Sequence, residues 1–327
     1  MRWLVAAALL ARGCCEAGAA PLLVFITFAD PKSIAKYRRT LGNHACYAAK
    51  QGYTSVLHVP TMARIKATGC CDRGFTYYKP ALLEAWLPRI PEGAYLVWWD
   101  ADIVMVRPEL RFDDLFFTAA GGLAAAVRAN KPDVVAQFPL NNAVFAIRNS
   151  PDGRTFLAAW RKLCMPPMIR HDFSDNGLFM EQMLRSLRGS AAVTECSKMV
   201  TKDMVKRTTC FGNAISKARG GLLKPRLFKS KGATKPWQWI FNQGGNSRKD
   251  MGNQTTFFHT KEPEKANREK VEQPRDFRPL GGWQDDCQEG LDLPNTFGTW
   301  VQRPNETQPC DLDRAKGEDA IRDCLGF

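Results

Sequence analysis

The first half of the chain alternates short apolar runs with amphipathic segments of helical period. Apolar runs cover residues 22–28, 53–59 and 95–99, and residues 33–50 and 79–87 repeat apolar side chains every three or four positions. Apolar runs of this kind are typical of strands that are buried on both faces of a sheet. Because strands that alternate with helices form βαβ units, the pattern predicts an α/β fold with a Rossmann-like, mostly parallel central sheet flanked by helices.

The pattern continues less regularly towards the C-terminus. The further predicted strands and helices cover residues 123–128, 143–148 and 255–259, and residues 154–163 and 176–187, respectively. After about residue 190 the sequence becomes basic and irregular, and its last part carries three cysteines but few apolar runs. We therefore expect an N-terminal targeting segment (residues 1–19), a main domain (20–265) and a cysteine-containing C-terminal tail (266–327).

The N-terminal segment has the features of a secretory signal peptide. Arg2 gives it a basic start, residues 4–11 are apolar, and Ala17-Gly18-Ala19 forms an A-x-A cleavage site. The apolar run is much shorter than the roughly 20 residues that span a bilayer, which favours a cleaved signal peptide over a short N-terminal anchor. Glycosylation sequons at Asn253 and Asn305 fit the same export route.

The cysteines add a second argument for export. The chain has eleven, none of them in a C-x-x-C pair, so the usual spacing of a zinc ribbon is absent. They are either buried thiols or disulfides, and the export signal favours disulfides. Removal of residues 1–19 leaves nine cysteines, an odd number, so at least one thiol stays outside intramolecular pairs.

Basic residues exceed acidic ones by 46 to 33, which gives a net charge of +13. Such a surplus indicates an anionic partner, for example a nucleotide phosphate, an acidic glycan or a membrane surface. Because the chain carries an export signal, we expect no nucleic-acid partner. The basic segment 198–231 is either a solvated face or a docking surface for an anionic glycan or a lumenal membrane.

Two carboxylates, Asp100 and Asp102, directly follow the apolar strand predicted over residues 95–99. Ligands of open parallel sheets bind beyond the carboxyl ends of the strands. In extended backbone the two side chains would point to the same side, where they would repel each other unless a cation lay between them. Hard divalent cations bind such oxygens and bridge them to phosphates, so we expect Mn²⁺ or Mg²⁺ holding a diphosphate. The alternative is a solvated turn.

Five segments, in this order, resemble one family. They are His44–Tyr53, Tyr78–Leu83 with its Tyr-Lys-Pro-Ala-Leu-Leu, Tyr95–Met105 with its Trp-Trp-Asp-Ala-Asp, Leu140–Asn149, and Asn176–Leu187. Together they resemble the retaining glycosyltransferases of family 34, which include fungal α-galactosyl- and α-mannosyltransferases and plant xyloglucan α-xylosyltransferases. The resemblance covers about residues 21–262 and implies a GT-A fold.

The resemblance also implies a donor and a metal. The donor is a nucleotide-diphospho-sugar, namely UDP-galactose, UDP-xylose or GDP-mannose, and the metal is usually Mn²⁺. Asp100, Asp102 and His259 match the metal-binding residues of the family, with Asp100 also nearer the nucleotide ribose. Lys79 and Lys261 are the residues expected on the nucleotide side, with Lys261 near the diphosphate.

Three further residues are expected near the transferred sugar. By resemblance, Glu181 and Gln182 match an acidic-Gln pair on the sugar or acceptor side, although Glu181 stands where the family has Asp. Asn141 lines the acceptor pocket or the donor-sugar pocket. A carboxylate beside the sugar C1 is either a nucleophile or a stabiliser of positive charge. The alternative is attack on the same face of the sugar without a nucleophile. Trp237 and Trp239 are candidates for stacking on an acceptor sugar.

The sequence thus predicts a metal-dependent retaining glycosyltransferase that acts on a glycan or glycoprotein acceptor. The signal peptide predicts the secretory pathway, either the Golgi lumen or membrane, with secretion as the alternative. Two other interpretations stay open. One is a retaining GT-A enzyme of another family, and the other is a secreted, non-catalytic protein that binds carbohydrate or polyanions.

Overall fold

The structure is a computed structural model of the chain. The residues that it describes are 22–29, 31–70, 75–105, 110–113, 133–138, 141–165, 174–198, 210–211, 213–214, 225–229, 241–243, 257–259, 298–304, 310–316 and 318–325. The strand predicted over residues 123–128 and the targeting segment of residues 1–19 lie outside these residues.

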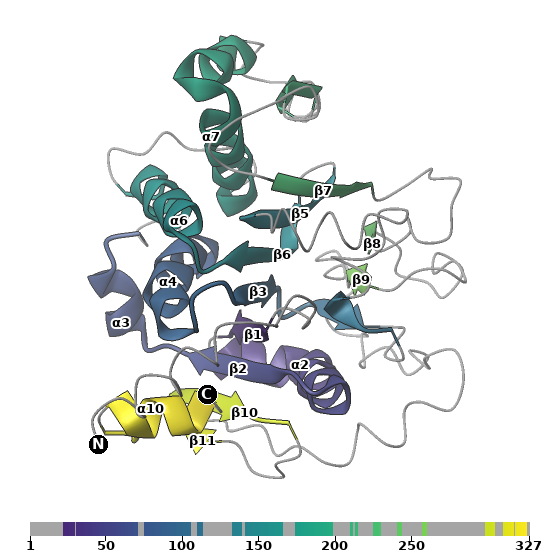
Figure 1. Ribbon diagram of the computed structural model, residues 1–327, viewed down its shortest axis with the longest axis vertical. Helices are drawn as coiled ribbons and strands as arrows, with labels where there is room; N and C mark the ends of the chain where they lie inside the picture. Colours follow the sequence, from purple (N-terminus) through teal and green to yellow (C-terminus); the bar gives the residue numbers. More distant parts are fainter. Residues whose placement is uncertain are drawn as a thin grey trace, which may run out of the picture.

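The centre of the structure is an eight-stranded sheet in the order β11-β10-β2-β1-β3-β6-β5-β7 (Figure 1). Its strands, in chain order, are β1 (Leu23–Phe28), β2 (Thr54–Val59), β3 (Tyr95–Trp99), β5 (Val134–Phe138), β6 (Asn141–Arg148), β7 (Pro225–Lys229), β10 (Gly298–Gln302) and β11 (Cys310–Asp311). A second sheet has the order β4-β9-β8. Its strands are β4 (Ile103–Met105), β8 (Phe241–Gln243) and β9 (Phe257–His259).

The three strands predicted first form the parallel part of the sheet. β1 pairs in parallel with β2 on one side and with β3 on the other, and β5 pairs in parallel with β7. β6 is antiparallel to both of its neighbours, β3 and β5. Only two residues join it to β5, a length that permits a hairpin but no crossover. β10 is antiparallel to β2. The predicted α/β class is confirmed, and the sheet as a whole is mixed.

The order of the parallel strands creates a topological switch point. The chain runs from β1 to β2 on one side, and then crosses β1 to form β3 on the other side. In sheets of this kind, ligands bind in the crevice beyond the carboxyl ends of the strands at the reversal. The fold alone therefore predicts a ligand site beyond the end of β3, which Asp100 directly follows.

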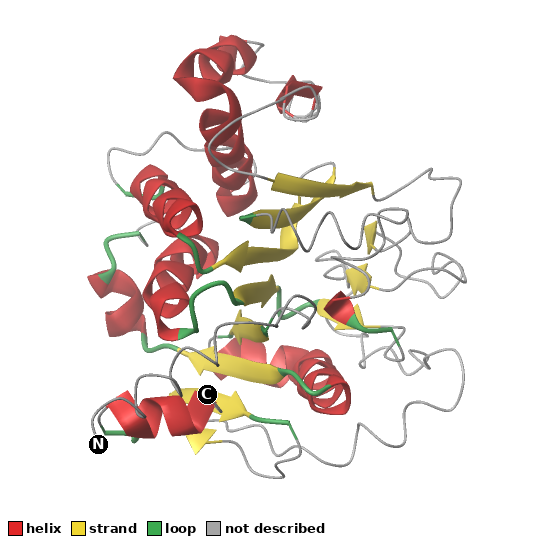
Figure 2. Cartoon of the chain, viewed as in Figure 1, coloured by secondary structure: helices red, strands yellow, loops and turns green. Residues whose placement is uncertain are grey.

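Helices cover both faces of the sheet (Figures 1 and 2). They are α2 (Pro31–Gln51), α3 (Met62–Ala67), α4 (Tyr78–Trp86), α6 (Pro151–Leu163), α7 (Ser174–Lys198) and α10 (Glu318–Leu325), with short 3-10 turns at Phe75–Tyr77 and Leu87–Arg89. Helices α4, α6 and α7 share one hydrophobic cluster with one face of the sheet, and α2 packs on the other face. All helices predicted in the described part are confirmed.

The two tryptophans of β3 show how the strand is buried on both faces. Trp98 belongs to the cluster with α4, α6 and α7, whereas Trp99 belongs to the cluster on the α2 side. Both are at most 1% exposed. This alternation is what extended backbone requires, and it confirms that both side chains pack in the core.

Two glycines fix helix ends. Gly52 has a φ of 75° and ends α2, where Tyr53 N donates to Ala48 O at 2.8 Å. The structure begins α2 at Pro31, which is two residues before the start of the segment predicted over residues 33–50.

Gly153, in the first turn of α6, is required for a different reason. A Cβ on this residue would lie 2.1 Å from Arg148 O, so only glycine fits there.

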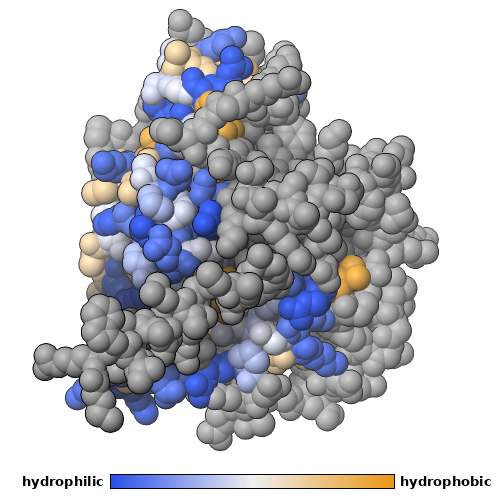
Figure 3. Space-filling model, viewed as in Figure 1, coloured by the Kyte–Doolittle hydropathy of each residue, from blue (hydrophilic) through white to orange (hydrophobic). Residues whose placement is uncertain are grey.

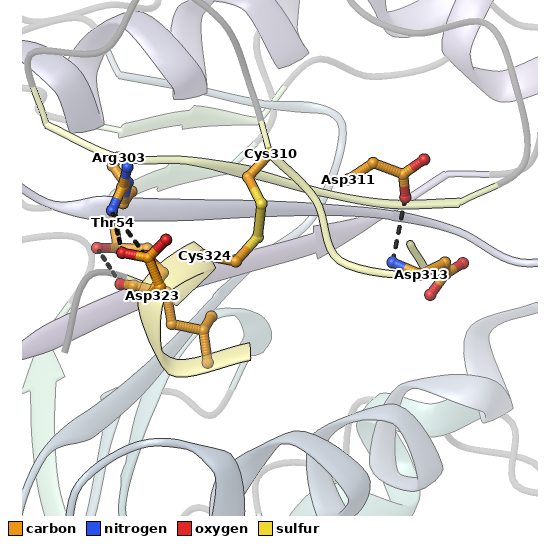
Figure 4. The surroundings of a disulfide bond; sticks show 8 residues. Thr54, Arg303, Cys310, Asp311, Asp313, Asp323 and Cys324 are labelled. Atoms are coloured by element: carbon orange, nitrogen blue, oxygen red, sulfur yellow. Dashed lines mark hydrogen bonds and ion pairs between the residues drawn. A yellow bond between two sulfur atoms is a disulfide. The ribbon is translucent and has the colours of Figure 1, made fainter. Parts of the chain in front are cut away.

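The segment predicted as a tail contributes to the same sheet and core. β10 pairs with β2, and the disulfide Cys310–Cys324 joins β11 to α10 (Figure 4). Thr54 Oγ1 of β2 donates to Leu325 O of α10 at 3.4 Å. The C-terminal segment therefore forms an edge of the main fold.

The predicted disulfides are confirmed in the described part of the chain. Cys196–Cys210 joins the end of α7 to residue 210, and Cys46 is also disulfide-bonded. Cys70 and Cys164 are buried and lie outside any disulfide.

The described surface on the face shown in Figure 3 is mainly hydrophilic. Of the described large apolar side chains, Leu22, Met62 and Met165 are the exposed ones. No helix among the described residues is long and apolar enough to cross a bilayer.

Candidate functional site

Asp100 directly follows the carboxyl end of β3, at the switch point of the parallel strands. Its backbone N donates to Ala143 O of β6 at 2.8 Å, and its O accepts from Ile103 N at 3.0 Å. The second bond closes a turn over Asp100–Ile103, and β4 begins at the last residue of this turn. Because this stretch is turned, the expectation that Asp100 and Asp102 share one side of an extended strand is wrong. The hydrogen bond across the turn is the physical reason.

A buried lysine holds the carboxylate of Asp100. Lys79 stands in the first turn of α4, and its side chain is 4% exposed. Its Nζ lies 2.8 Å from Asp100 Oδ1 and 2.9 Å from Asp175 Oδ2, and it donates to Asn142 O at 3.2 Å. Trp98 Nε1 donates to the same Asp100 Oδ1 at 2.6 Å. One ammonium thus bridges two carboxylates, as a buried charge requires.

The second carboxylate comes from the first turn of α7. Asn142 Nδ2 donates to Asp175 Oδ2 at 2.6 Å, and Asn142 N donates to Asn176 Oδ1 at 3.0 Å. A carboxylate in the first turn of a helix is also favoured by the helix dipole. These bonds tie the start of α7 to β6 and to the end of β3. Asp100, Lys79, Asn142 and Asp175 therefore form one cluster, called here the carboxylate cluster.

The cluster perturbs its own ionisable groups. Burial raises the pKa of Asp100 to about 6, an effect that Lys79 opposes and the nearby carboxylates of Asp102 and Asp175 reinforce. Burial alone would lower the pKa of Lys79, but the attraction of Asp100 and Asp175 outweighs it and raises that pKa. The lysine therefore stays protonated, and the cluster keeps a fixed positive charge between its carboxylates.

The second sheet brings the predicted histidine towards the same turn. In the antiparallel pair of β4 and β9, His259 lies opposite Ile103, the residue that follows Asp102. Among the described side chains, no group of three or more histidines, cysteines or carboxylates forms a ready metal cage. The chemistry of the residues nevertheless fits Mn²⁺ or Mg²⁺, because carboxylate oxygens suit both ions, and an imidazole is a common ligand of metals in proteins.

Glu181 and Gln182, the two predicted site residues of α7, bond to side chains of their own helix. Glu181 Oε1 accepts from Arg185 NH2 at 2.6 Å, and Gln182 Nε2 donates to Ser186 Oγ at 2.9 Å, all within α7. Glu181 lies six positions after Asp175 in the helix, which is about 9 Å along the axis. Asn141 begins β6, next to Asn142. The side chains of Asn141 and His259, and the whole of Lys261, Trp237 and Trp239, lie outside the description.

Sequence reasoning missed Asn142, Asp175 and Asn176 as a connected group. It expected α7 to begin at position 176, whereas the helix begins at Ser174, which puts Asp175 in its first turn. The available signal was an Asp-Asn pair at a helix start, where the helix dipole favours a carboxylate.

Comparisons with known proteins add little to this geometry. No protein-family model matches the chain, and no curated protein matches it in sequence. A glycosyltransferase involved in the glycosylation of the major capsid of PBCV-1 is 10% identical, with 64% of this chain and 82% of that chain covered and a TM-score of 0.38. An active-site mutant of LgtC is 12% identical, with 73% and 88% covered and a TM-score of 0.30. Both TM-scores are too low to establish a shared fold, so the function proposed below rests on the residues of this chain.

Proposed function

We propose that the chain is a metal-dependent retaining glycosyltransferase with a GT-A type domain. It moves a sugar from a nucleotide-diphospho-sugar to a hydroxyl group of a glycan or glycoprotein. The observation that carries the proposal is the carboxylate cluster beyond β3, at the switch point of the parallel strands and directly before Asp102. A solvated turn would not require a buried lysine and a buried tryptophan N–H to hold one of its carboxylates.

The metal is the part of the site that neutralises the departing diphosphate. Asp102, His259 and the free side of Asp100 are the residues that would hold Mn²⁺ or Mg²⁺, and such an ion stabilises negative charge on phosphate oxygens. Lys79 does not reach the diphosphate in this assignment, because its ammonium is buried between carboxylates. Its role is to hold Asp100 and Asp175 in place. Lys261 remains our proposal for the diphosphate side.

Asp175 is our choice for the carboxylate nearest the transferred sugar. It shares Lys79 with Asp100, whereas Glu181 is paired with Arg185 further along the helix. Asp175 Oδ2 is bound by an ammonium and an amide N–H, which makes it a weak nucleophile. We therefore favour attack of the acceptor hydroxyl on the same face of the sugar that the diphosphate leaves. The negative charge of Asp175 then stabilises the positive charge that develops at C1.

The disulfides of the chain support a place in the secretory pathway, because such bonds persist in oxidising compartments. We propose the Golgi lumen or membrane, with secretion as the alternative. The second candidate function is a secreted carbohydrate-binding protein without catalysis. It accounts for the disulfides and the tryptophans, but it gives no role to the buried Lys79 between two carboxylates.

A donor screen tests the proposal. Purified full-length chain is incubated with UDP-galactose, UDP-xylose or GDP-mannose, with Mn²⁺ or with a chelator, and nucleotide release is measured. We expect release from one donor that depends on Mn²⁺. No release from any UDP- or GDP-sugar with metal present would favour the binding protein instead.

A further inference from the structure

Helix α2 holds the strand that follows Asp102 through two neighbouring side chains. His44 Nε2 lies 2.6 Å from Ile103 O. Asn43 makes two bonds to Met105, since its Nδ2 donates to Met105 O at 3.2 Å and its Oδ1 accepts from Met105 N at 2.9 Å. Ile103 and Met105 are the first and last residues of β4. Three hydrogen bonds thus fix both ends of β4 to α2.

The setting of His44 makes this contact specific. The residue is 1% exposed, and its ring stacks on Trp99 with centroids 4.0 Å apart and planes 15° apart. A carbonyl oxygen only accepts, so Nε2 must carry the ring hydrogen. Among the described residues, Nδ1 has no hydrogen-bond partner. The one N–H of the neutral ring is therefore committed to Ile103.

Ile103 links this contact to both parts of the proposed metal site. Its N closes the turn that contains Asp102, and its place in β4 is opposite His259 in β9. A displacement of Ile103 would therefore move Asp102 and His259 relative to Asp100, which is held separately by Lys79. Helix α2 therefore fixes the position of Asp102 and His259 through β4, and α4 fixes the position of Asp100 through Lys79.

We propose that Asn43 and His44 are positioning residues that set the geometry, and hence the metal affinity, of Asp102 and His259. The inference rests on the proposed function, because it concerns the metal of that function. Groups that orient metal ligands from behind affect metal affinity strongly, and their loss typically costs about 10–100-fold. Neither residue contacts the metal or the donor in this assignment.

The first test is Mn²⁺ binding, which needs no turnover. Free Mn²⁺ is measured by electron paramagnetic resonance in a titration of the full chain, with the nucleoside diphosphate of the accepted donor present. We expect His44→Ala and Asn43→Ser to weaken Mn²⁺ binding by about 10-fold or more. His44→Gln, whose amide can still donate to Ile103 O, should retain most of the affinity.

The kinetic test separates positioning from chemistry. In the donor-cleavage assay, His44→Ala should raise the Mn²⁺ concentration that gives half-maximal rate, while the rate at saturating Mn²⁺ falls less. Asn149→Ala is the matched control, because Asn149 is a buried Asn whose Nδ2 donates to Ile90 O at 2.6 Å near the opposite end of β3. It should lower stability without changing Mn²⁺ affinity.

The outcomes distinguish this inference from the proposed function. If His44→Ala and Asn43→Ser fold, by circular dichroism, and bind Mn²⁺ as tightly as the parent, the inference is overturned and the function stands. Equal weakening by Asn149→Ala would also overturn it, since the effect would then be general destabilisation. If His44→Ala does not fold, Asn43→Ser and His44→Gln decide the question. A parent chain that neither binds Mn²⁺ nor cleaves any donor would overturn the proposed function and this inference together.

Discussion

Lys79 and Asp100 form an ion pair at the carboxyl end of β3, with Nζ 2.8 Å from Oδ1. The same Nζ lies 2.9 Å from Asp175 Oδ2, so α4 provides the cation that keeps the end of β3 and the start of α7 together. The side chain of Asp100 is 28% exposed, whereas those of Lys79 and Asp175 are at most 8% exposed. Asp100 is therefore the most exposed of the three side chains.

Removal of the Lys79 ammonium should leave the repulsion between the carboxylates of Asp100 and Asp175 uncompensated. Lys79→Met keeps much of the side-chain volume but leaves Asp100 and Asp175 without their shared partner. We expect the free energy of unfolding to fall by about 3–5 kcal/mol, because a buried ion pair is broken from one side only. Urea denaturation at neutral pH measures this change.

A double variant provides the control for that prediction. Lys79→Met combined with Asp175→Asn removes the uncompensated charge as well as the cation. It should therefore be more stable than Lys79→Met alone, with a coupling energy between the two sites. Simple addition of the two single losses would contradict the ion pair described here.

The choice between Asp175 and Glu181 is open to a direct comparison. Asp175→Asn and Glu181→Gln are matched changes that remove one charge each from the same helix. If Asp175 stabilises charge at the sugar, its variant should lose about 100-fold or more in the rate of donor cleavage. Glu181→Gln should lose far less. The reverse order would restore the assignment that the sequence pattern suggested.

A buried histidine away from the cluster should make stability depend on pH. His58 Nδ1 lies 2.9 Å from Thr299 Oγ1 and Nε2 lies 2.9 Å from Tyr78 OH, and burial, reinforced by Arg64, lowers its pKa to about 3. Below its ordinary pKa of about 6.5, the unfolded chain binds a proton that the folded chain does not. Stability from this group is therefore complete above about pH 6.5 and is lost as the pH falls towards about 3.

The check is a series of urea denaturations from pH 7.5 to pH 4 on the parent and on His58→Gln. The difference in unfolding free energy between the two should shrink with falling pH, with a limiting slope of about 1.4 kcal/mol per pH unit. A difference that stays constant over this range would show that His58 binds protons equally in the folded and unfolded chains, which would contradict the prediction.

The disulfide Cys310–Cys324 should stabilise the edge of the sheet. It joins β11 to α10, and Arg303 NH1 donates to Asp323 O at 2.7 Å beside it (Figure 4). A bond that closes a loop of this length contributes about 3 kcal/mol through the entropy of the unfolded chain. Replacement of both cysteines by serine should lower the free energy of unfolding by that amount. The pair Cys196–Cys210 has the same sequence separation of 14 and is the matched control, with a similar expected loss.

Much of the fold was readable from the apolar pattern. The runs that became β1, β2 and β3 are buried on both faces, and such strands have a strong local signal. β4, β5, β7, β8, β10 and β11 were not predicted. They are at most five residues long, and their pairing depends on partners far away in sequence, such as β2 for β10.

The site could be predicted only in part for the same reason. Asp100 and Asp102 could be proposed from the sequence because they follow an apolar strand. The role of Asp175 depends on Lys79, which is almost a hundred residues earlier in the chain, and no local pattern reports such a contact. The contact between His44 and Ile103 is likewise non-local, and it became visible only with the packing of α2 on β4.

The central claim is that Asp102 takes part in metal-dependent cleavage of a nucleotide-diphospho-sugar. The most direct measurement is nucleotide release from the accepted donor by the parent and by Asp102→Asn, each over a range of Mn²⁺ concentrations. Asp102→Asn keeps the size of the side chain and removes its charge. We expect Mn²⁺-dependent release by the parent and its loss in the variant, with an unchanged circular dichroism spectrum. Release by Asp102→Asn at the parental rate and with the parental Mn²⁺ dependence would contradict the account.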